Sequence, residues 1–333
     1  MRRSKRSAEL NSAVSQPYRR FLICNRLNTL SQVRISDLDS SQPVNNNLRK
    51  NSGTFDTPES STKDSSETVS LKVLRFRAGA RLRAQADKVA REEPLEVRVQ
   101  GHSVVVTMRT PGQDQELAAG FLFTEGVVQQ GRDLIEIAPC RQSDSPENIL
   151  NVFLAPGVEI DFERLRRHVF ATSSCGLCGK ASIDAVHQNF PPIKSDIKVT
   201  SRTLLQLPRR MRAVQRTFSQ TGGLHAAAVF NAHGKLVALR EDIGRHNAVD
   251  KVVGHGLLTK ALPFSSHILL VSGRASFEII QKALAARIPV VCAISAPSSL
   301  AVEFAKESGQ TLVGFLGNRT MNIYTGAERI RAV

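Results

Sequence analysis

Residues 267–315 read HILLVSGRASFEIIQKALAARIPVVCAISAPSSLAVEFAKESGQTLVGF, and this stretch decides the fold. Short apolar runs alternate in it with segments whose apolar residues recur at helical spacing. The predicted elements, in order, are strand 267–273, helix 277–286, strand 290–294, helix 299–306 and strand 311–315. Strands that alternate with helices pair in parallel, because each helix carries the chain back across the sheet. The stretch therefore predicts a layered α/β domain.

The segment just before this stretch extends the same domain. Residues 226–230 and 236–239 are apolar and flank the sequence Asn-Ala-His-Gly, which predicts a β-hairpin. Residues 247–258 have helical periodicity. We assign this α/β domain to residues 171–333.

A smaller β-rich subdomain is predicted for residues 86–170. Residues 94–99 and 103–108 alternate polar and apolar side chains around a turn at Gly101-His102, which indicates a second hairpin. Apolar residues at helical spacing predict a helix over 114–124, and residues 148–154 read as another strand.

The first 70 or so residues are rich in Ser, Asn, Thr and Gln. Such sequence buries too little apolar surface to offset the entropy of the chain, so we expect a disordered polar extension. We expect ordered structure to begin around residues 86–95.

The composition and the charge of the chain indicate which partners and which cellular location to expect. The net charge of +15 attracts polyanions, which include nucleic acids, acidic membranes, phosphates and acidic protein surfaces, and the charge alone does not choose between them. Five cysteines in 333 residues are too few for a disulfide scaffold and indicate a reducing, cytoplasmic location. The sequence has no apolar run long enough to span a membrane, and we expect neither a membrane nor a nucleic acid among the partners.

Two cysteines lie in a glycine-rich loop, Cys175-Gly176-Leu177-Cys178-Gly179. A helix is predicted just after it, and the positive end of a helix favours the thiolate form of a nearby cysteine. Lys180 adds a positive neighbour. Cys175 and Cys178 are therefore candidate nucleophiles.

Four interpretations of this loop compete. The thiolate could carry sulfur as a persulfide, the pair could cycle as a redox dithiol, it could supply half of a zinc site, or it could be structural. A closed zinc site needs four ligands, and the other three cysteines are isolated in the sequence. The loop also does not follow the first strand of a thioredoxin-like unit. We expect no metal ion of the protein's own.

A polar pocket wall is predicted between residues 222 and 251. His225 opens one strand, and residues 241–251, EDIGRHNAVDK, lead into a helix. In the functional interpretation, His225 or His246 moves protons and Arg245 binds an anion. In the structural one, Asp242 caps the helix and Arg245 pairs with Asp250 at the surface.

Two turns from strand to helix, at residues 272–276 and 295–299, form a candidate phosphate site. Backbone N–H groups at helix starts bind anions, and Arg274 can add a bidentate contact. Side by side at the carboxyl ends of parallel strands, the turns would cradle a nucleotide. The motifs of P-loop ATPases and of dinucleotide-binding folds are absent from the sequence.

Together these motifs resemble those of the FdhD/NarQ family of formate dehydrogenase accessory sulfurtransferases. The matching stretches are EEPLEVR at 92–98, FATSSCGLCG at 170–179, TGGLHAAA at 221–228, EDIGRHNAVDK at 241–251 and SGR at 272–274. They occur in the family's order and cover about residues 86–333.

The resemblance implies a fold and an activity. The fold is a cytidine-deaminase-like layered α/β domain that lacks zinc chemistry. The activity is sulfurtransferase: a cysteine desulfurase donates persulfide sulfur, which passes to the Mo- or W-bis(molybdopterin guanine dinucleotide) cofactor and makes formate dehydrogenase active. A non-catalytic chaperone that binds this cofactor is the alternative, and a homodimer is a further expectation.

The resemblance also assigns roles to residues. The persulfide cysteine falls on Cys175, and Cys178 is the second cysteine of the loop. The segment that binds the cofactor falls on Phe315, Leu316, Gly317, Asn318, Arg319 and Thr320. In this segment Gly317-Asn318 stands where the family has Arg-Gly. Ser272, Gly273, Arg274, His225, Arg245 and His246 complete the predicted cofactor site.

Overall fold

The computed structural model describes residues 67–78, 82–141, 143, 145–162, 165 and 189–332. All of these residues belong to one compact unit, Lys63–Val333. The predicted disordered extension therefore lies almost entirely outside the described residues.

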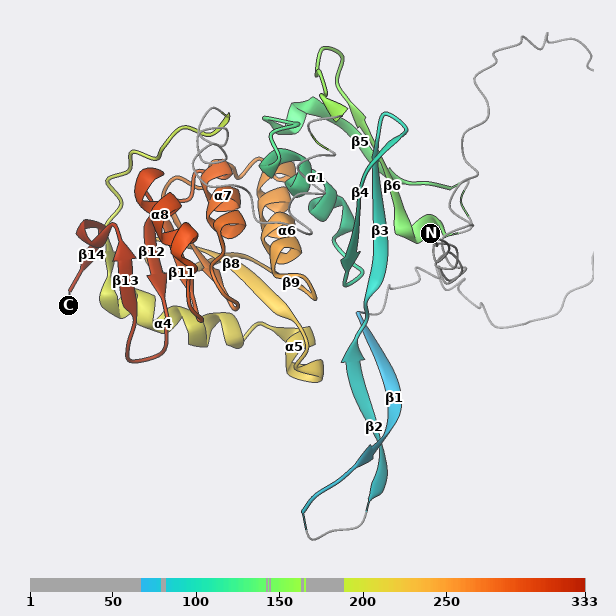
Figure 1. The fold of residues 1–333 in the computed structure, drawn as a ribbon, viewed down its shortest axis with the longest axis horizontal. Helices are drawn as coiled ribbons and strands as arrows, with labels where there is room; N and C mark the ends of the chain where they lie inside the picture. Colours follow the sequence, from blue (N-terminus) through green and yellow to red (C-terminus); the bar gives the residue numbers. More distant parts are fainter. Residues whose placement is uncertain are drawn as a thin grey trace, which may run out of the picture. The chain divides into compact units, whose positions relative to one another are not determined.

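A six-stranded mixed sheet forms the centre of the α/β part, in the order β13-β12-β11-β10-β8-β9 (Figure 1). The strands are β8 (His225–Asn231), β9 (Leu236–Asp242), β10 (His267–Val271), β11 (Val290–Ala293), β12 (Thr311–Gly314) and β13 (Asn322–Thr325). As predicted, β10, β11 and β12 are parallel. The hairpin β8–β9 is also confirmed, and it joins the sheet antiparallel to β10. β13 has no counterpart in the prediction.

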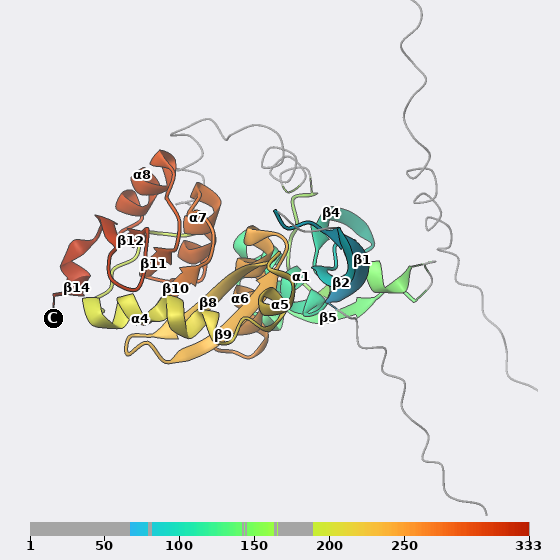
Figure 2. The same ribbon diagram turned by 90° about the horizontal axis from the view of Figure 1, so that it is seen from below.

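Helices cover both faces of this sheet, which makes three layers (Figure 1, Figure 2). The helices α6 (Arg245–Leu258), α7 (Phe277–Ala285) and α8 (Ser299–Glu307) pack on the face that carries Leu269 and Val271. Helix α4 (Ser201–Arg212) packs on the opposite face, against Ile268 and Leu270. Alternate residues of a strand point to opposite faces, so an uninterrupted apolar strand is buried on both sides.

The β-rich part is a four-stranded sheet with the order β4-β3-β6-β5. Its strands are β3 (Glu93–Val99), β4 (His102–Arg109), β5 (Leu134–Pro139) and β6 (Ile149–Leu154). The predicted hairpin is confirmed, but its turn lies one residue earlier than predicted, at Gln100-Gly101, where both residues have positive φ. Helix α1 (Asp114–Thr124) matches the predicted helix.

Helix α1 joins the two sheets, because it packs directly on α6. A Cβ placed on Gly120 would lie 1.8 Å from the Asp250 carbonyl oxygen, and one on Gly254 would lie 1.8 Å from that of Glu116. Two backbones can approach this closely only where neither residue has a side chain. One hydrophobic core therefore runs from β3 through α1 and α6 to β10 and β12. The predicted division at residues 170 and 171 lies outside the described residues and stays a prediction.

Ordered structure begins earlier than predicted. Strands β1 (Thr68–Arg75) and β2 (Arg83–Ala90) form a two-stranded antiparallel ribbon (Figure 1). Basic and polar side chains interrupt the apolar residues of this segment, so its composition resembles that of the polar residues before it. The likeness to cytidine deaminases stays a prediction, whereas the mixed α/β class is confirmed.

The remaining elements are small. Helix α5 (Arg216–Thr221) follows α4, and the short strands β7 (Val199–Thr200) and β14 (Ile330–Arg331) pair in parallel. Three 3₁₀ turns, η2 (Gly131–Asp133), η3 (Pro146–Asn148) and η4 (Ala327–Arg329), complete the described elements.

Candidate functional site

Three loops meet at one edge of the six-stranded sheet, because β10, β11 and β12 are parallel and all end there. The Ala275 N–H donates to the Ala296 carbonyl at 3.2 Å, and the Ser298 N–H donates to that of Ala275 at 3.0 Å. The Phe315 N–H donates to the Ser295 carbonyl at 3.1 Å. The two predicted helix-start turns therefore lie side by side, with the 315–320 segment next to them.

The loop after β10 also contacts the start of β8. The Ser272 hydroxyl accepts from the Ala226 N–H at 2.8 Å, and the Ser272 N–H donates to the Ala226 carbonyl at 2.9 Å. Gly273 is buried against His225 and Arg245, since a Cβ there would lie 3.3 Å from the His225 ring and 3.7 Å from the Arg245 Cδ. The structure thus brings together four predicted residues from three separate segments.

His225 has an altered acidity in this environment. Burial lowers the pKa of its imidazole, and the charges of Arg245 and His246 lower that pKa further. The carboxylate of Asp242 opposes them. A neutral imidazole can accept a proton, which is the role the sequence suggested for it.

One hydrogen-bond donor of the Arg245 guanidinium has no acceptor among the described residues. Its Nε is buried and has no hydrogen-bond partner among the described residues. A buried guanidinium donor without an acceptor is costly, so the site suits an incoming anion.

His246 is fixed by α7 instead of facing a ligand freely. Its Nε2 lies 2.8 Å from a carboxylate oxygen of Glu278 and 3.1 Å from the Ser276 hydroxyl. The hydrogen bond from His246 outweighs burial and holds the pKa of Glu278 below its ordinary value. Glu278 was not singled out from the sequence, because an acidic residue in the first turn of a helix is common.

The acidic residues of the 241–251 segment are structural, and the predicted surface pair of Arg245 with Asp250 is wrong. Asp250 is buried, and its carboxylate binds Lys282 at 2.9 Å and the Thr124 hydroxyl at 2.9 Å. Asp242 lies 2.7 Å from Lys251, and both side chains are fully buried. Asp242 does not cap α6 through a first-turn N–H. It accepts from the N–H of Gly244, the residue just before the helix, at 2.8 Å.

The 315–320 segment forms a tight exposed turn. Phe315 has φ of 51° and is half-exposed, whereas the Leu316 side chain is buried in the core under α4. The Gly317 N–H donates to the Thr320 carbonyl at 2.9 Å. Asn318, Arg319 and Thr320 are exposed. The ring of Phe315 and the polar tip therefore face solvent, while Leu316 anchors the turn.

Arg274 and Arg319 are the exposed cations of this edge. Neither forms a hydrogen bond or ion pair with another described residue. Ser298 is an ordinary helix cap, since its hydroxyl accepts from the Ala301 N–H at 3.2 Å. Together with Arg245 and the backbone of the loops, the two arginines can bind a phosphorylated ligand.

Cys175 and Cys178 lie outside the described residues. The two cysteines that the structure describes, Cys140 and Cys292, are both buried. Burial raises the pKa of the Cys292 thiol strongly, so it is unreactive. The described ranges contain no cluster of three metal-binding side chains. None of the helices in those ranges has both the length and the apolar character needed to cross a bilayer.

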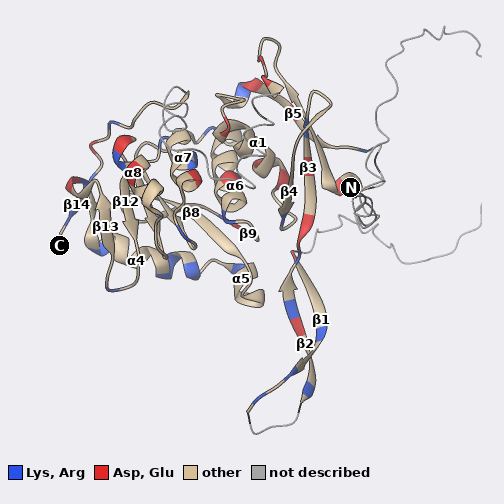
Figure 3. Ribbon diagram, viewed as in Figure 1, with Lys and Arg blue, Asp and Glu red and all other residues tan. Residues whose placement is uncertain are grey.

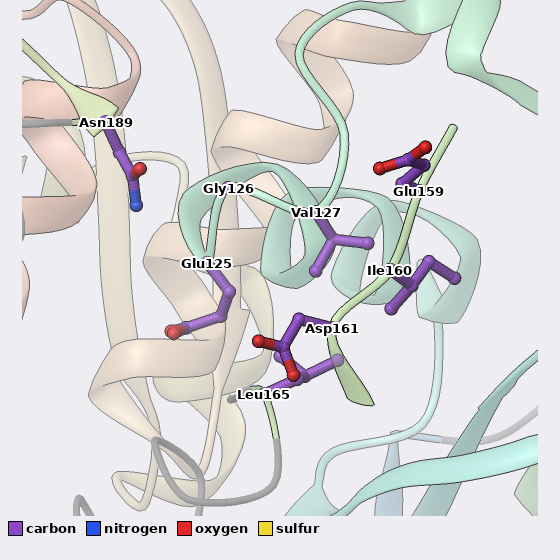
Figure 4. A pocket seen from close by; sticks show the side chains of 8 residues that line it. All are labelled: Glu125, Gly126, Val127, Glu159, Ile160, Asp161, Leu165 and Asn189. Carbon is purple, nitrogen blue, oxygen red and sulfur yellow. The ribbon is translucent and has the colours of Figure 1, made fainter. Parts of the chain in front are cut away.

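A pocket of about 170 Å³ lies where the described chain stops before the cysteine segment and resumes after it (Figure 4). Leu165 and Asn189, the nearest described residues on either side of 166–188, both line it. Its carboxylates come from Glu125, Glu159 and Asp161. This pocket is acidic and was not foreseen from the sequence, because its residues come from distant segments.

Known proteins resemble this chain over most of its length. The model of the FdhD/NarQ family matches residues 90–331. A Streptomyces coelicolor protein named "Sulfur carrier protein FdhD" is 53% identical over 274 residues, which are 79% of this chain and 95% of the relative. Proteins of the same name from Mycobacterium tuberculosis and Saccharolobus solfataricus are 51% and 44% identical, over 73% and 74% of this chain and 92% and 91% of their own lengths.

A solved structure shares the fold. The crystal structure of a putative formate dehydrogenase accessory protein from Desulfotalea psychrophila has a TM-score of 0.63 and 25% identity. The match covers 79% of this chain and 99% of that one.

Proposed function

Because this chain belongs to the FdhD/NarQ family, we propose that it is a sulfurtransferase that carries sulfur for the maturation of formate dehydrogenase. The names of its relatives, and of the solved structure it resembles, support both halves of this proposal. The protein takes sulfur from a cysteine desulfurase and delivers it to the Mo- or W-bis(molybdopterin guanine dinucleotide) cofactor, which it binds as a substrate.

Cys175 is the sulfur-carrying residue in this proposal. Its thiolate attacks the terminal sulfur of the donor's persulfide, so that a new S–S bond forms on Cys175 while the donor's S–S bond breaks and leaves a donor thiolate. This is nucleophilic covalent catalysis, in which one difficult transfer is divided into two. The buried Cys140 and Cys292 are poor alternatives for the role.

The edge formed by the loops after β10, β11 and β12 binds the cofactor in this proposal. One observation carries the assignment: Arg245 lies beside Gly273, and the Arg245 Nε is buried without a partner among the described residues. A guanine dinucleotide cofactor supplies several phosphate oxygens that would satisfy this donor and the exposed Arg274 and Arg319. The aromatic ring of Phe315 can stack on a flat base.

Persulfide loading tests the proposal directly. The protein is incubated with a cysteine desulfurase and cysteine, and its intact mass is measured. We expect one added sulfur atom on the wild type and none on Cys175→Ala.

The matched control is Cys178→Ala, which changes the other cysteine of the same loop. Loading that survives in Cys175→Ala and disappears in Cys178→Ala would transfer the role to Cys178. A wild type that acquires no sulfur at all would rule out the carrier function.

A non-catalytic chaperone is the second candidate, because the cationic edge alone suffices to bind the cofactor. It requires that Cys175→Ala still activates formate dehydrogenase in cells that lack the native protein. An inactive formate dehydrogenase in that strain, with normal levels of the variant, eliminates the chaperone.

A further inference from the structure

The β1–β2 ribbon exposes apolar side chains that the rest of the described chain does not cover. Leu74 and Phe76 are each 69% exposed, Leu82 is 61% exposed and Leu71 is 46% exposed. Leu71 and Leu74 differ by three positions in a strand, so they lie on opposite faces of the ribbon. A two-stranded ribbon is marginally stable in water, and exposed apolar groups on it indicate a surface that becomes covered.

The ribbon is continuous with a basic surface on α4 and α5. The Lys88 Nζ donates to the Gln220 side chain at 3.1 Å, and Arg212 lies 4.2 Å above the ring of Phe218. No acidic residue occurs from Lys198 to Thr221 in the sequence. Residues 67–78, 82–90 and 198–221 form this surface, and they contain only two acidic residues, Glu67 and Asp87. Their exposed cations are Lys72, Arg75, Arg77, Arg83, Lys88, Lys198, Arg202, Arg209, Arg210, Arg212 and Arg216 (Figure 3).

This charge selects acidic partners, and the chemistry of the ribbon favours a protein among them. Three of the four exposed apolar side chains named above, Leu71, Leu74 and Leu82, are aliphatic and offer no face on which bases could stack, which leaves Phe76 as the one aromatic ring among them. In the described strand pairing, Val69 to Arg75 of β1 pair with β2 alone, so the other edge of this segment can accept an added strand. A protein can supply that strand, whereas a lipid surface or a nucleic acid cannot.

The base of the ribbon reaches the candidate site. The Ala90 Cβ lies 3.8 Å from the Cβ position of Gly223, two residues before His225. A partner bound along the ribbon would therefore lie beside the edge that binds the cofactor in the proposed function.

We infer that the β1–β2 ribbon, with the basic faces of α4 and α5, is the docking surface for an acidic surface of the formate dehydrogenase polypeptide that receives the cofactor. This inference rests on the proposed function for the identity of the partner. The apolar ribbon residues provide the buried contact, and the surrounding arginines and lysines speed and orient the encounter.

The affinity for purified formate dehydrogenase that lacks its cofactor tests the inference. In biolayer interferometry, Lys72→Glu combined with Arg83→Glu should weaken binding at least about tenfold at low salt. Leu71→Ser combined with Leu74→Ser should also weaken it, without a change in charge. Because these side chains lie outside the core, both variants should retain the wild-type circular dichroism spectrum.

The matched control is Arg132→Glu combined with Lys306→Glu, which makes the same charge change at exposed positions elsewhere and should leave the affinity unaltered. All variants should load persulfide and bind guanosine diphosphate as the wild type does, which separates this inference from the proposed function. Unchanged affinity of both ribbon variants would overturn it. So would tighter wild-type binding to single-stranded DNA or to phosphatidylserine vesicles than to the enzyme.

Discussion

At the scale of single residues, the protonation of His225 makes the charge of the candidate site depend on pH. Its imidazole lies against Gly273, and burial, Arg245 and His246 all lower its pKa. Since the unfolded chain takes up this proton first as the pH falls below about 6.5, protonation destabilises the folded protein from that point down to the lower folded pKa.

Arg245→Met should raise the pKa of His225, because it removes one of the positive charges that oppose protonation. The ¹H NMR titration of the His225 ring measures this change. Arg274→Met is the control, since Arg274 does not contribute to the lowered pKa. An unaltered titration in Arg245→Met would show that the charge of Arg245 does not contribute to the lowered pKa of His225.

At the scale of elements, the contact between α1 and α6 holds the two sheets together. The helices meet where Gly120 lies against the backbone of Asp250, and Gly254 against that of Glu116. Beside this contact, Lys282 of α7 joins Asp250 and Thr124 in a buried polar network. Burial lowers the pKa of Lys282, but the carboxylates of Asp250, Glu125 and Glu278 together outweigh burial and hold this pKa above its ordinary value.

Gly120→Ala should lower the free energy of unfolding by about 3 kcal/mol or more, because its Cβ would collide with backbone that cannot move aside. Urea denaturation measures the change. Gly317→Ala is the control, since its Cβ would meet the nearest atom at an ordinary 3.7 Å. Equal stabilities of the two variants would mean that α1 and α6 can separate at little cost.

At the scale of the whole molecule, the shared core predicts cooperative unfolding. Buried residues of β3, α1, α6 and β10 belong to one cluster, although they come from both the β-rich and the α/β parts. Such a core loses its contacts as a unit, so the described part of the chain should unfold in one transition.

Amide hydrogen exchange checks this prediction. The slowest amides of β3 and β10 should exchange with the same free energy of opening, and Gly120→Ala should reduce both equally. A β3 that opens well before β10 would show that the two parts are separate folding units.

The local periodicity of the sequence was sufficient to predict the parallel strands β10, β11 and β12, the helices between them and helix α1. The periodicity was insufficient to predict helix α4. The apolar residues of this helix, Leu204, Leu207 and Met211, are interrupted by Pro208 and by several arginines. The periodicity was also insufficient for β1 and β2, since polar and basic residues interrupt their apolar positions. The turns at residues 272–276 and 295–299 could be placed side by side in advance, because the carboxyl ends of parallel strands share one edge, whereas the family resemblance alone assigned residues 315–320 to the site.

The sequence by itself determined the fold class, the family motifs and the candidate sulfur carrier Cys175, because strand, helix and motif patterns are local properties of the chain. Only the tertiary structure decided which charges are buried. It paired Asp250 with Lys282 rather than Arg245, and left the Arg245 Nε without a partner among the described residues. An ion pair forms only where the fold places two side chains from distant segments within a few ångströms of each other. The periodicity of apolar residues along the chain does not predict those distances.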